Sequence, residues 1–350
     1  MAFSLEKLST LNAVSGCEDE ARDYIIPLIK DKCDSIEVDS IGNVIAFKKG
    51  IKSDYRILVG TNIDEVGFIV SEITDGGFIK FKTVGEIDPR TLVSKRVKVG
   101  KERISGVIGM KAIHLQTKEE REAAVKTKDL YIDIGEKLKD DAIERVKPGD
   151  YIAFDSDFAE LGDTVKGKAL DRFGTAVLIN SLSAVPMYDT FYVFSTQREI
   201  PCSVMGRGMR IASYRINPDF ALIISTVNSN DGGDGKNAAA RLGDGAVIEY
   251  MDKSSIANTS FCDGLLKLAN DRNIRFQKKT SSIGLSVGGA VAIASYGAAI
   301  ATASLPVRYS HTPVSYVNKD DIDALGELCR AFIKESDVVI NGIIKKTDSD

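Results

Sequence analysis

The spacing of hydrophobic and polar positions changes twice along the chain. Up to about residue 65, two helical stretches at 5–14 and 18–33 come first. They precede the hairpin-like run SIEVDSIGNVIAFKKG at 35–50 and the apolar strand RILVG at 56–60. Helix and strand patterns that alternate in this way are typical of an α/β domain.

Between about 66 and 164 the pattern changes to short strands separated by Gly and Asp. The strands are GFIVSEI, GFIKFKTV, KRVKVG, ISGVIGM, LYIDIG and DYIAFD. One charged helical stretch, TKEEREAAVKT, interrupts them. This pattern predicts a small β-barrel inserted into the other domain.

After residue 165 helices and strands alternate again. The expected elements are helices at 171–186, from about 203 to 214 and from Asp321 to about Glu335, and strands at 190–197 and 220–227. We therefore expect an α/β protein with a mixed sheet. Residues 1–65 and 165–350 would form one discontinuous domain, and residues 66–164 the inserted barrel.

Composition and charge narrow the function classes. The chain has 350 residues, of which 43% are hydrophobic and 27% charged, which argues against disordered and fibrous classes. A net charge of −4 leaves no basic surplus for nucleic acid, and no apolar run approaches the ~20 residues that span a bilayer. The N-terminal segment lacks the order of a signal peptide. We expect a cytoplasmic protein without nucleic-acid or membrane partners.

Cysteines and histidines limit the chemistry further. An odd number of cysteines without CxxC spacing argues against a disulfide framework and predicts buried or partly buried thiols. They are Cys17, Cys33, Cys202, Cys262 and Cys329. The two histidines are His114, in the barrel segment, and His311. His114 is expected to pack or to form an interface contact, so the chemistry must rely mainly on carboxylates.

Polar residues at the ends of predicted strands are the candidate site residues, because open α/β sheets bind ligands there. They are Asn62, Asp64, Asp171, Arg198, Glu199, Ser225 and His311. Each alone is weak evidence, since a strand-end Asp is more often a helix N-cap and a single His an ordinary side chain. The Asp- and Gly-rich stretch 228–237 resembles a calcium loop but lacks the bidentate Glu, which favours a surface loop.

Taken in order, the motifs resemble one family. They are SGCEDEARDYI, VDSIGNVIAFKKG, NIDEVGFIV, VGEIDPRTLVSKRV, GVIGMKAIHL, DLYIDIG, VKGKALDRFGTAVL, TQREI and RYSHTP. In this order they resemble the tetrahedral (TET) aminopeptidases, the glutamyl or deblocking aminopeptidases of metallopeptidase family forty-two, which are related to other dizinc exopeptidases. The resemblance implies a catalytic α/β domain around a β-barrel dimerisation domain. It also implies hydrolysis of N-terminal residues from peptides, and dimers that assemble into hollow dodecamers.

The resemblance implies that the second metal position keeps its ligands. Asp171 matches the carboxylate that bridges two metals, Glu199 matches a glutamate of the second metal, and His311 matches its histidine. Two carboxylates and one imidazole suit a single zinc or cobalt ion, with water completing a tetrahedron.

The same resemblance implies that the first metal position has lost its ligands. A histidine of the family stands where this chain has Asn62, and the aspartate that orients it remains as Asp64. Ser225 replaces an aspartate ligand, and Val287 stands near a further acidic position. Arg198 occupies the place of the glutamate that acts as general base, and an arginine stays protonated and cannot accept a proton.

Three hypotheses follow for function. The first is a metallo-aminopeptidase-like protein that binds one divalent cation at most and has weak or no activity. The second is a catalytically silent paralogue that acts as a structural, regulatory or peptide-binding subunit. Such a protein would form homo-oligomers or co-assemble with an active relative. In its site, which would hold no metal, Arg198 would pair with Asp171 or Glu199. In the third, Arg198 clamps a substrate carboxylate or phosphate.

Overall fold

An eight-stranded mixed sheet forms the centre of the larger part of the molecule. The computed structural model describes residues 4–200, 206–232 and 238–347. The strands run in the order β1 (Ser35–Val38), β2 (Val44–Lys48), β12 (Tyr188–Ser195), β3 (Lys52–Asn62), β13 (Phe220–Asn228), β16 (Ala299–Val307), β14 (Ala246–Glu249) and β15 (Phe276–Lys279). The four central strands β12, β3, β13 and β16 are parallel, whereas β2 and β14 pair with them antiparallel. The predicted α/β class with a mixed sheet is confirmed.

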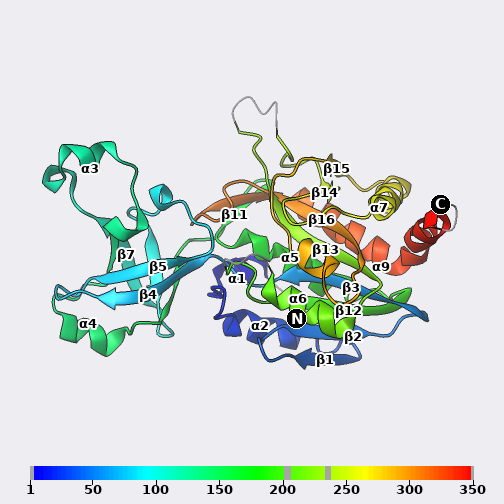
Figure 1. Ribbon diagram of the computed structural model, residues 1–350, viewed down its shortest axis with the longest axis horizontal. Helices are drawn as coiled ribbons and strands as arrows, with labels where there is room; N and C mark the ends of the chain where they lie inside the picture. The colour runs from blue at the N-terminus through cyan, green and yellow to red at the C-terminus, as the bar shows by residue number, and fades with distance from the viewer. Residues whose placement is uncertain (1–3, 201–205, 233–237, 348–350) are drawn as a thin grey trace.

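Helices cover both faces of this sheet (Figure 1). One face packs against α1 (Leu5–Thr10), α2 (Asp19–Ile29), α5 (Phe173–Ser181), α7 (Thr259–Asp271) and α9 (Lys319–Thr347), and the other against α6 (Arg207–Ile216) and α8 (Gly288–Ala292). Each face packs into a hydrophobic core, and successive side chains of β13 alternate between the two cores. Leu222 and Ile224 belong to the first core, and Ala221 and Ile223 belong to the second. Because both faces are covered, the central strands read as continuous apolar runs.

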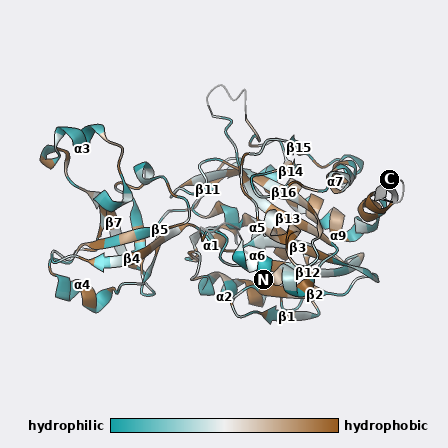
Figure 2. Cartoon of the chain, viewed as in Figure 1, coloured by the Kyte–Doolittle hydropathy of each residue, from teal (hydrophilic) through white to brown (hydrophobic). Residues whose placement is uncertain are grey.

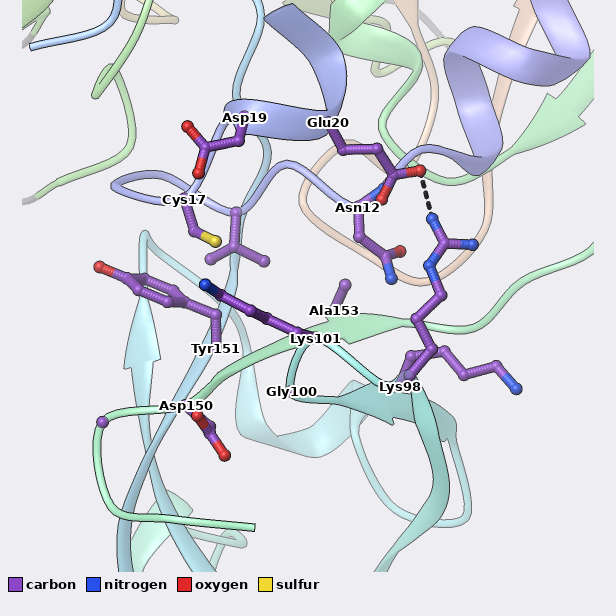
Figure 3. Close-up of a pocket in the computed structure, with 13 residues that line it drawn as sticks. Asn12, Cys17, Asp19, Glu20, Lys98, Gly100, Lys101, Asp150, Tyr151 and Ala153 are labelled. Carbon is purple, nitrogen blue, oxygen red and sulfur yellow. Dashed lines mark hydrogen bonds and ion pairs between the residues drawn. The ribbon is translucent and has the colours of Figure 1, made fainter. Parts of the chain in front are cut away.

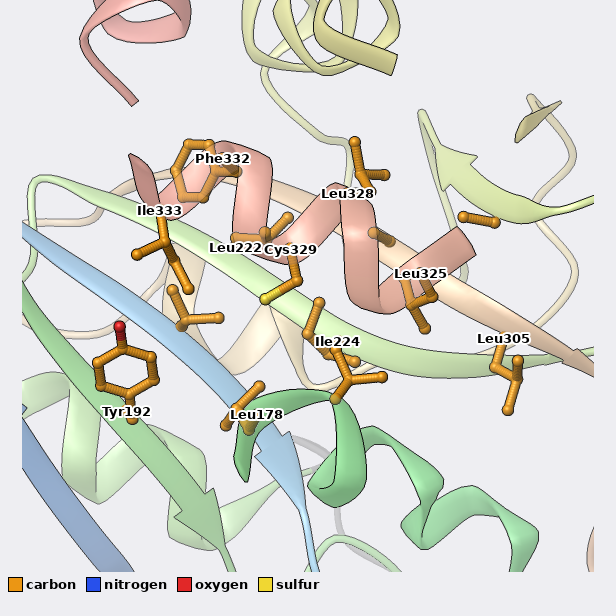
Figure 4. Packing of buried hydrophobic residues seen from close by; sticks show 14 of the residues in the cluster. Leu178, Tyr192, Leu222, Ile224, Leu305, Leu325, Leu328, Cys329, Phe332 and Ile333 are labelled. Carbon is orange, nitrogen blue, oxygen red and sulfur yellow. The ribbon is translucent and has the colours of Figure 1, made fainter. Parts of the chain in front are cut away.

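The helix α9 closes the first core. Its Leu325, Cys329 and Phe332 are fully buried and pack near Leu222 and Ile224 of the sheet (Figure 4). Burying side chains of this size contributes roughly 1.5–3 kcal/mol each. The helix extends past the predicted end near Glu335, where a non-helical backbone (φ −126°, ψ 27°) marks a kink.

Six strands between Gly67 and Phe154 close into a barrel, which stands apart from the large sheet in Figures 1 and 2. They are β4 (Gly67–Ile73), β5 (Ile79–Val84), β6 (Arg96–Val99), β7 (Ile104–Met110), β8 (Leu130–Asp133) and β9 (Tyr151–Phe154). The barrel has a hydrophobic core of its own, in which the Phe68 ring meets those of Phe81 and Phe154 edge-on at 4.9 and 5.2 Å. Two short helices, α3 (Lys118–Glu122) and α4 (Lys139–Arg145), complete this part.

A third, small sheet ties together two segments that carry site residues. Its strands are β10 (Ala159–Leu161), β11 (Thr164–Gly167) and β17 (Ser315–Asn318). The strand β11 leads towards Asp171, and β17 follows His311 along the chain. The pairing of β11 with β17 therefore brings these two site segments to the same end of the molecule.

Several predicted boundaries were wrong. The helix expected at 171–186 begins as the 3-10 turn Leu170–Arg172, continues as α5 and ends at Ser181, because Pro186 and the entry into β12 need an extended chain. The charged stretch 117–127 is helical only in α3, which Thr117 and Glu120 cap at its N-terminus. The helix expected from about 203 begins at Arg207 in the described chain, and residues 201–205, with Cys202, lie outside it.

The structure also bears on the predictions for the cysteines, for His114 and for membrane-spanning helices. In the described chain Cys262 and Cys329 are buried and Cys17 and Cys33 half-buried, all as free thiols. His114 lies exposed in the 3-10 turn Ile113–Leu115. Its exposure argues against packing within the chain, and an interface contact remains a prediction. None of the helices in the described ranges has the length and apolar character needed to cross a bilayer.

Candidate metal centre

The candidate residues gather beyond the carboxyl ends of the parallel strands. Asn62 is the last residue of β3, Ser225 lies near the end of β13, and Glu199 and His311 follow β12 and β16. Asp171 lies in the 3-10 turn that leads into α5. Carboxyl ends of adjacent parallel strands meet at one edge of a sheet, which explains why segments far apart in sequence converge here.

Three of the predicted ligands lie together. Asp171, Glu199 and His311 each offer a ligand atom, and these atoms lie within 4.8 Å of one another. The Nε2 atom of His311 is 3.7 Å from Oδ2 of Asp171 and 3.6 Å from Oε2 of Glu199. The structure thus assembles the two-carboxylate, one-imidazole set that the sequence predicts.

A backbone carbonyl orients the imidazole of His311. Its Nδ1 atom lies 3.1 Å from the carbonyl oxygen of Glu86, which can only accept a hydrogen bond. Nδ1 therefore carries a proton, and Nε2 faces the two carboxylates. Glu86 lies between β5 and β6, so a connection of the barrel helps to build this site. Sequence reasoning missed this contact, because a backbone carbonyl leaves no residue signature.

Arg198 is part of the same cluster. Its Nη1 donates a hydrogen bond of 2.5 Å to Oε1 of Glu199 and lies 3.6 Å from Oδ2 of Asp171. The Nη2 atom donates to the carbonyl of Leu285 over 3.1 Å, and the side chain is only 6% exposed. Both terminal nitrogens are therefore engaged within the protein, and only Nε lacks a hydrogen-bond partner among the described residues. This leaves little of the guanidinium to clamp a substrate anion.

Asp64 acts on the backbone of its neighbour. Its Oδ2 accepts the backbone N–H of Glu199 at 2.9 Å, which fixes the turn that carries this carboxylate. The amide of Asn62 is turned to the carbonyl of Asp64, over 3.3 Å. Ser225 lies in register with Ser304 of the next strand. The residue after it, Thr226, donates to Oδ1 of Asp171 at 3.0 Å, and sequence reasoning missed it although it adjoins a candidate position.

Charges inside the cluster balance one another. Burial would raise the pKa of Glu199, but Arg198 and His311 outweigh it and lower this pKa to about 2. Burial would likewise lower the pKa of His311, whereas Glu199 and Asp171 raise it to about 9. Two cationic side chains thus face two carboxylates. Burial and the charge of Glu199 together raise the pKa of Asp64 to about 6.

The residues present do not fit two metal ions. The nitrogen of the Asn62 amide already donates to a carbonyl, the Ser225 hydroxyl is neutral, and Arg198 adds positive charge where a pair of dications needs negative charge. One divalent cation does suit the donor atoms of Asp171, Glu199 and His311. Arg198 then competes with that cation for the two carboxylates.

Comparison with known proteins agrees with this architecture. The model of the M42 glutamyl aminopeptidase family matches residues 42–328. The chain belongs to this family. A putative aminopeptidase of Acetivibrio thermocellus is 33% identical over 91% of this chain and 94% of its own length.

Solved structures of similar proteins share the whole fold. An aminopeptidase from the archaeon Desulfurococcus kamchatkensis superimposes with a TM-score of 0.90 at 30% identity, covering 96% of this chain and 95% of its own. The TET1 peptidase of Pyrococcus horikoshii, which can assemble into a tetrahedron or a large octahedral shell, gives 0.83 at 31% identity, covering 95% of this chain and 98% of its own. The mixed-sheet α/β fold of this M42 chain is therefore that of TET aminopeptidases.

A buried ion network lies next to the site and consists of Glu65, Lys168 and Arg172. Oε1 of Glu65 lies 3.2 Å from Nζ of Lys168 and 3.2 Å from Nη2 of Arg172, and all three side chains are buried. Arg172 also donates to the carbonyls of Ile63 and Leu8, at 2.7 Å each. The network joins the segments before and after Asp64 and Asp171. This network could not be predicted from the sequence, since charged residues next to strand ends are normally solvated.

Two other features of this M42 chain lie outside the cluster. A cleft of about 420 Å³ separates the start of α2 from the barrel, with Cys17 and Asp19 on one side and Lys101 and Tyr151 on the other (Figure 3). None of the three candidate ligands lines it.

The stretch that resembles a calcium loop is the second feature. Its Asp231 accepts two hydrogen bonds from Arg308, of 2.6 and 2.8 Å. The carboxylate is thus engaged with a guanidinium, and residues 233–237 lie outside the described chain.

Proposed function

We propose that this M42 chain is an aminopeptidase-like protein whose centre binds at most one divalent cation, zinc or cobalt. On this proposal it removes N-terminal residues from peptides weakly or not at all. The position of Arg198, hydrogen-bonded to Glu199 and beside Asp171, carries the proposal. By family resemblance this is the position of the general base.

The chemistry of Arg198 explains the expected loss of rate. A guanidinium stays protonated at working pH and cannot take a proton from an attacking water. Loss of a positioned general base typically costs about 10²–10⁴-fold in rate. A bound cation would polarise the scissile carbonyl and acidify water. Asp171, Glu199 and His311 would hold that cation, with Nδ1 of His311 fixed by the Glu86 carbonyl.

Metal analysis combined with an activity assay tests the proposal. The purified protein is expected to carry no more than one zinc or cobalt per chain after incubation with either ion. A panel of aminoacyl anilides should show turnover close to background with both metals. Two metals per chain at this site, or robust hydrolysis of any anilide, would refute the proposal.

A silent paralogue is the second candidate function, and the balance of charges supports it. Arg198 and His311 already neutralise Asp171 and Glu199, so the site is electrostatically complete without a cation. Such a protein would serve as a structural, regulatory or peptide-binding subunit, alone or with an active relative. Metal analysis that finds no cation at all, together with an intact fold, would favour this candidate over the first.

We also propose that the chain forms a cytoplasmic homo-oligomer, from a dimer to a dodecamer, with residues 66–164 as its dimerisation domain. The assembly of the Pyrococcus horikoshii peptidase supports this, as do Ile113 and Leu115, which are exposed beside the barrel. Light scattering should give a mass well above the 37.9 kDa of one chain. Replacing Ile113 and Leu115 by Glu should lower that mass, and a monomeric wild-type protein would contradict the proposal.

A further inference from the structure

A groove of about 580 Å³ lies between α6 and α8, on the face of the sheet that these helices cover. Its lining includes three arginines, Arg207, Arg210 and Arg215, and no carboxylate. The whole chain has 50 acidic and 46 basic residues, so an all-cationic lining departs from the rest of the protein. A surface of one charge selects ligands of the opposite charge.

Two of the three guanidiniums have no partner among the residues that the structure describes. Arg215 forms an ion pair with Glu37, with 2.6 Å between Nη2 and Oε1. Arg207 and Arg210 are exposed, and in the described part of the chain neither forms an ion pair or a side-chain hydrogen bond. They are three residues apart on a helix, so they stand on the same face of α6. Two neighbouring guanidiniums are therefore available to one ligand.

The same groove has an apolar part. Ile211 is 37% exposed, Tyr214 69% and Ile293 57%, and all three line the groove. Single exposed apolar residues are ordinary, but here an aromatic ring and two branched aliphatic chains line one hollow. A ligand that fits must combine negative charge with an apolar side chain.

We propose that the α6–α8 groove binds an acidic peptide segment of another polypeptide. Glutamate or aspartate carboxylates of that segment pair with Arg207 and Arg210, since a guanidinium offers two parallel N–H groups to a carboxylate. A leucine or phenylalanine of the segment covers Ile211, Tyr214 and Ile293. The inference does not depend on the metal centre or on hydrolysis.

The position of the groove adds a reason to expect a peptide. Gln197, which precedes Arg198 in the chain, also lines the groove. The start of α6 is packed close to the site, because a Cβ at Gly206 would lie 2.8 Å from Val287, and Leu285 accepts the hydrogen bond of Arg198. An acidic segment in the groove would thus extend next to the candidate metal centre.

Fluorescence anisotropy tests the inference directly. The probe is an octapeptide of alternating glutamate and leucine with fluorescein on its N-terminus, measured in excess EDTA so that cation binding plays no part. Wild-type protein should bind it, and the variant Arg207→Gln/Arg210→Gln should bind at least about tenfold more weakly, as expected for two lost charged contacts. Tyr214→Ala should weaken binding without changing its salt dependence.

Matched controls decide what a loss of binding means. Arg96→Gln/Arg145→Gln removes the same charge from two exposed arginines far along the chain from α6, in β6 and α4, and should leave affinity unchanged. Equal weakening by this control, equal binding of a lysine–leucine octapeptide, or no binding by wild type would each overturn the inference. A single-stranded oligonucleotide that binds more tightly through the same arginines would overturn it in favour of nucleic acid.

Discussion

Arg198 and Glu199 are neighbours in sequence, and their side chains form a hydrogen-bonded ion pair with 2.5 Å between Nη1 and Oε1. The pair is buried, and the same Nη1 lies 3.6 Å from Asp171. A positive side chain thus occupies the position at which the resemblance to the family implies a general base beside two divalent cations. Removing one partner of a buried pair leaves the other charge uncompensated, which makes the pair a sensitive point for both stability and cation binding.

Replacing Arg198 by Met should increase affinity for a divalent cation. The change removes the positive charge that competes for Glu199 and Asp171, and two unit charges about 4 Å apart interact by roughly 4 kcal/mol at an effective dielectric constant near 20. We expect zinc or cobalt to bind at least about tenfold more tightly, at one ion per chain. Isothermal titration calorimetry measures both quantities.

The stability of the same variant provides a second readout. Without cation, Arg198→Met should unfold at a lower temperature than wild type, because Glu199 and Asp171 lose their guanidinium. Added cobalt should recover stability, since a ligand that binds only the folded state stabilises it. Arg96→Met in the barrel should change neither property. Unchanged cation affinity in Arg198→Met would show that the guanidinium does not compete.

Restoring the lost positions together should restore the second metal. The triple variant Asn62→His, Arg198→Glu and Ser225→Asp supplies an imidazole, a base and a carboxylate ligand. The metal content should rise towards two per chain by elemental analysis, with aminoacyl-anilide hydrolysis following. Arg198→Glu alone should restore little, because the first metal would still lack its ligands. A triple variant that is folded but keeps one metal or none would refute the assignment of these positions.

The bounds of several strands and the clustering of the candidate ligands could be predicted from the sequence. The runs 67–73 and 104–110 are strands with the predicted bounds. Buried and exposed positions alternate along most of 104–110, whereas in 67–73 the alternation is interrupted by a β-bulge between Val70 and Glu72. The three candidate ligands Asp171, Glu199 and His311 were also expected at strand ends, and the structure brings them together.

Other features could not be predicted, for physical reasons. The contact of His311 with the Glu86 carbonyl depends on how the barrel meets the large sheet, and no residue type marks it. The ion pair of Arg198 was one of several open alternatives, since sequence gives no rotamer. The small sheet formed with β17 joins segments about 150 residues apart, and strands this short carry too few alternating positions to be recognised.

Replacing Glu65 by Gln should destabilise the fold strongly. Glu65 accepts from Lys168, at 3.2 Å, and from the Ala13 backbone, at 2.9 Å, and its Oε1 lies 3.2 Å from Nη2 of Arg172. Its loss leaves two buried cations without a counter-charge, which typically costs about 3–5 kcal/mol. Urea denaturation should show this loss in the free energy of unfolding.

Two further variants separate this network from general charge effects. Glu65→Gln/Lys168→Met should recover part of the stability, since one of the unpaired cations is gone. Glu20→Gln breaks the more exposed pair with Arg103 and should cost about 1 kcal/mol or less. If Glu65→Gln costs no more than Glu20→Gln, the buried network contributes little to folding.

Replacing Asp231 by Asn should reduce stability in a pH-dependent way. Asp231 accepts hydrogen bonds from Nε and Nη2 of Arg308 and from the backbone N–H of Leu242. The hydrogen bonds from Arg308 lower the pKa of Asp231 below its usual value of 3.8, although burial acts in the opposite direction. The ionised carboxylate is therefore favoured in the folded protein, and its loss should cost about 1–2 kcal/mol near neutral pH.

The pH dependence of Asp231→Asn follows from the direction of this pKa shift. A carboxyl whose folded pKa is depressed contributes stability above its unfolded pKa, and this contribution is lost as the pH falls towards the folded value. The stability difference between wild type and Asp231→Asn should thus be constant from pH 7 to 5 and shrink below about pH 4. Urea denaturation at each pH measures it, and Arg308→Gln in a double-mutant cycle isolates the pair. A difference that grows on acidification would mean that Asp231 is protonated more readily in the folded protein, contrary to the ion pair with Arg308.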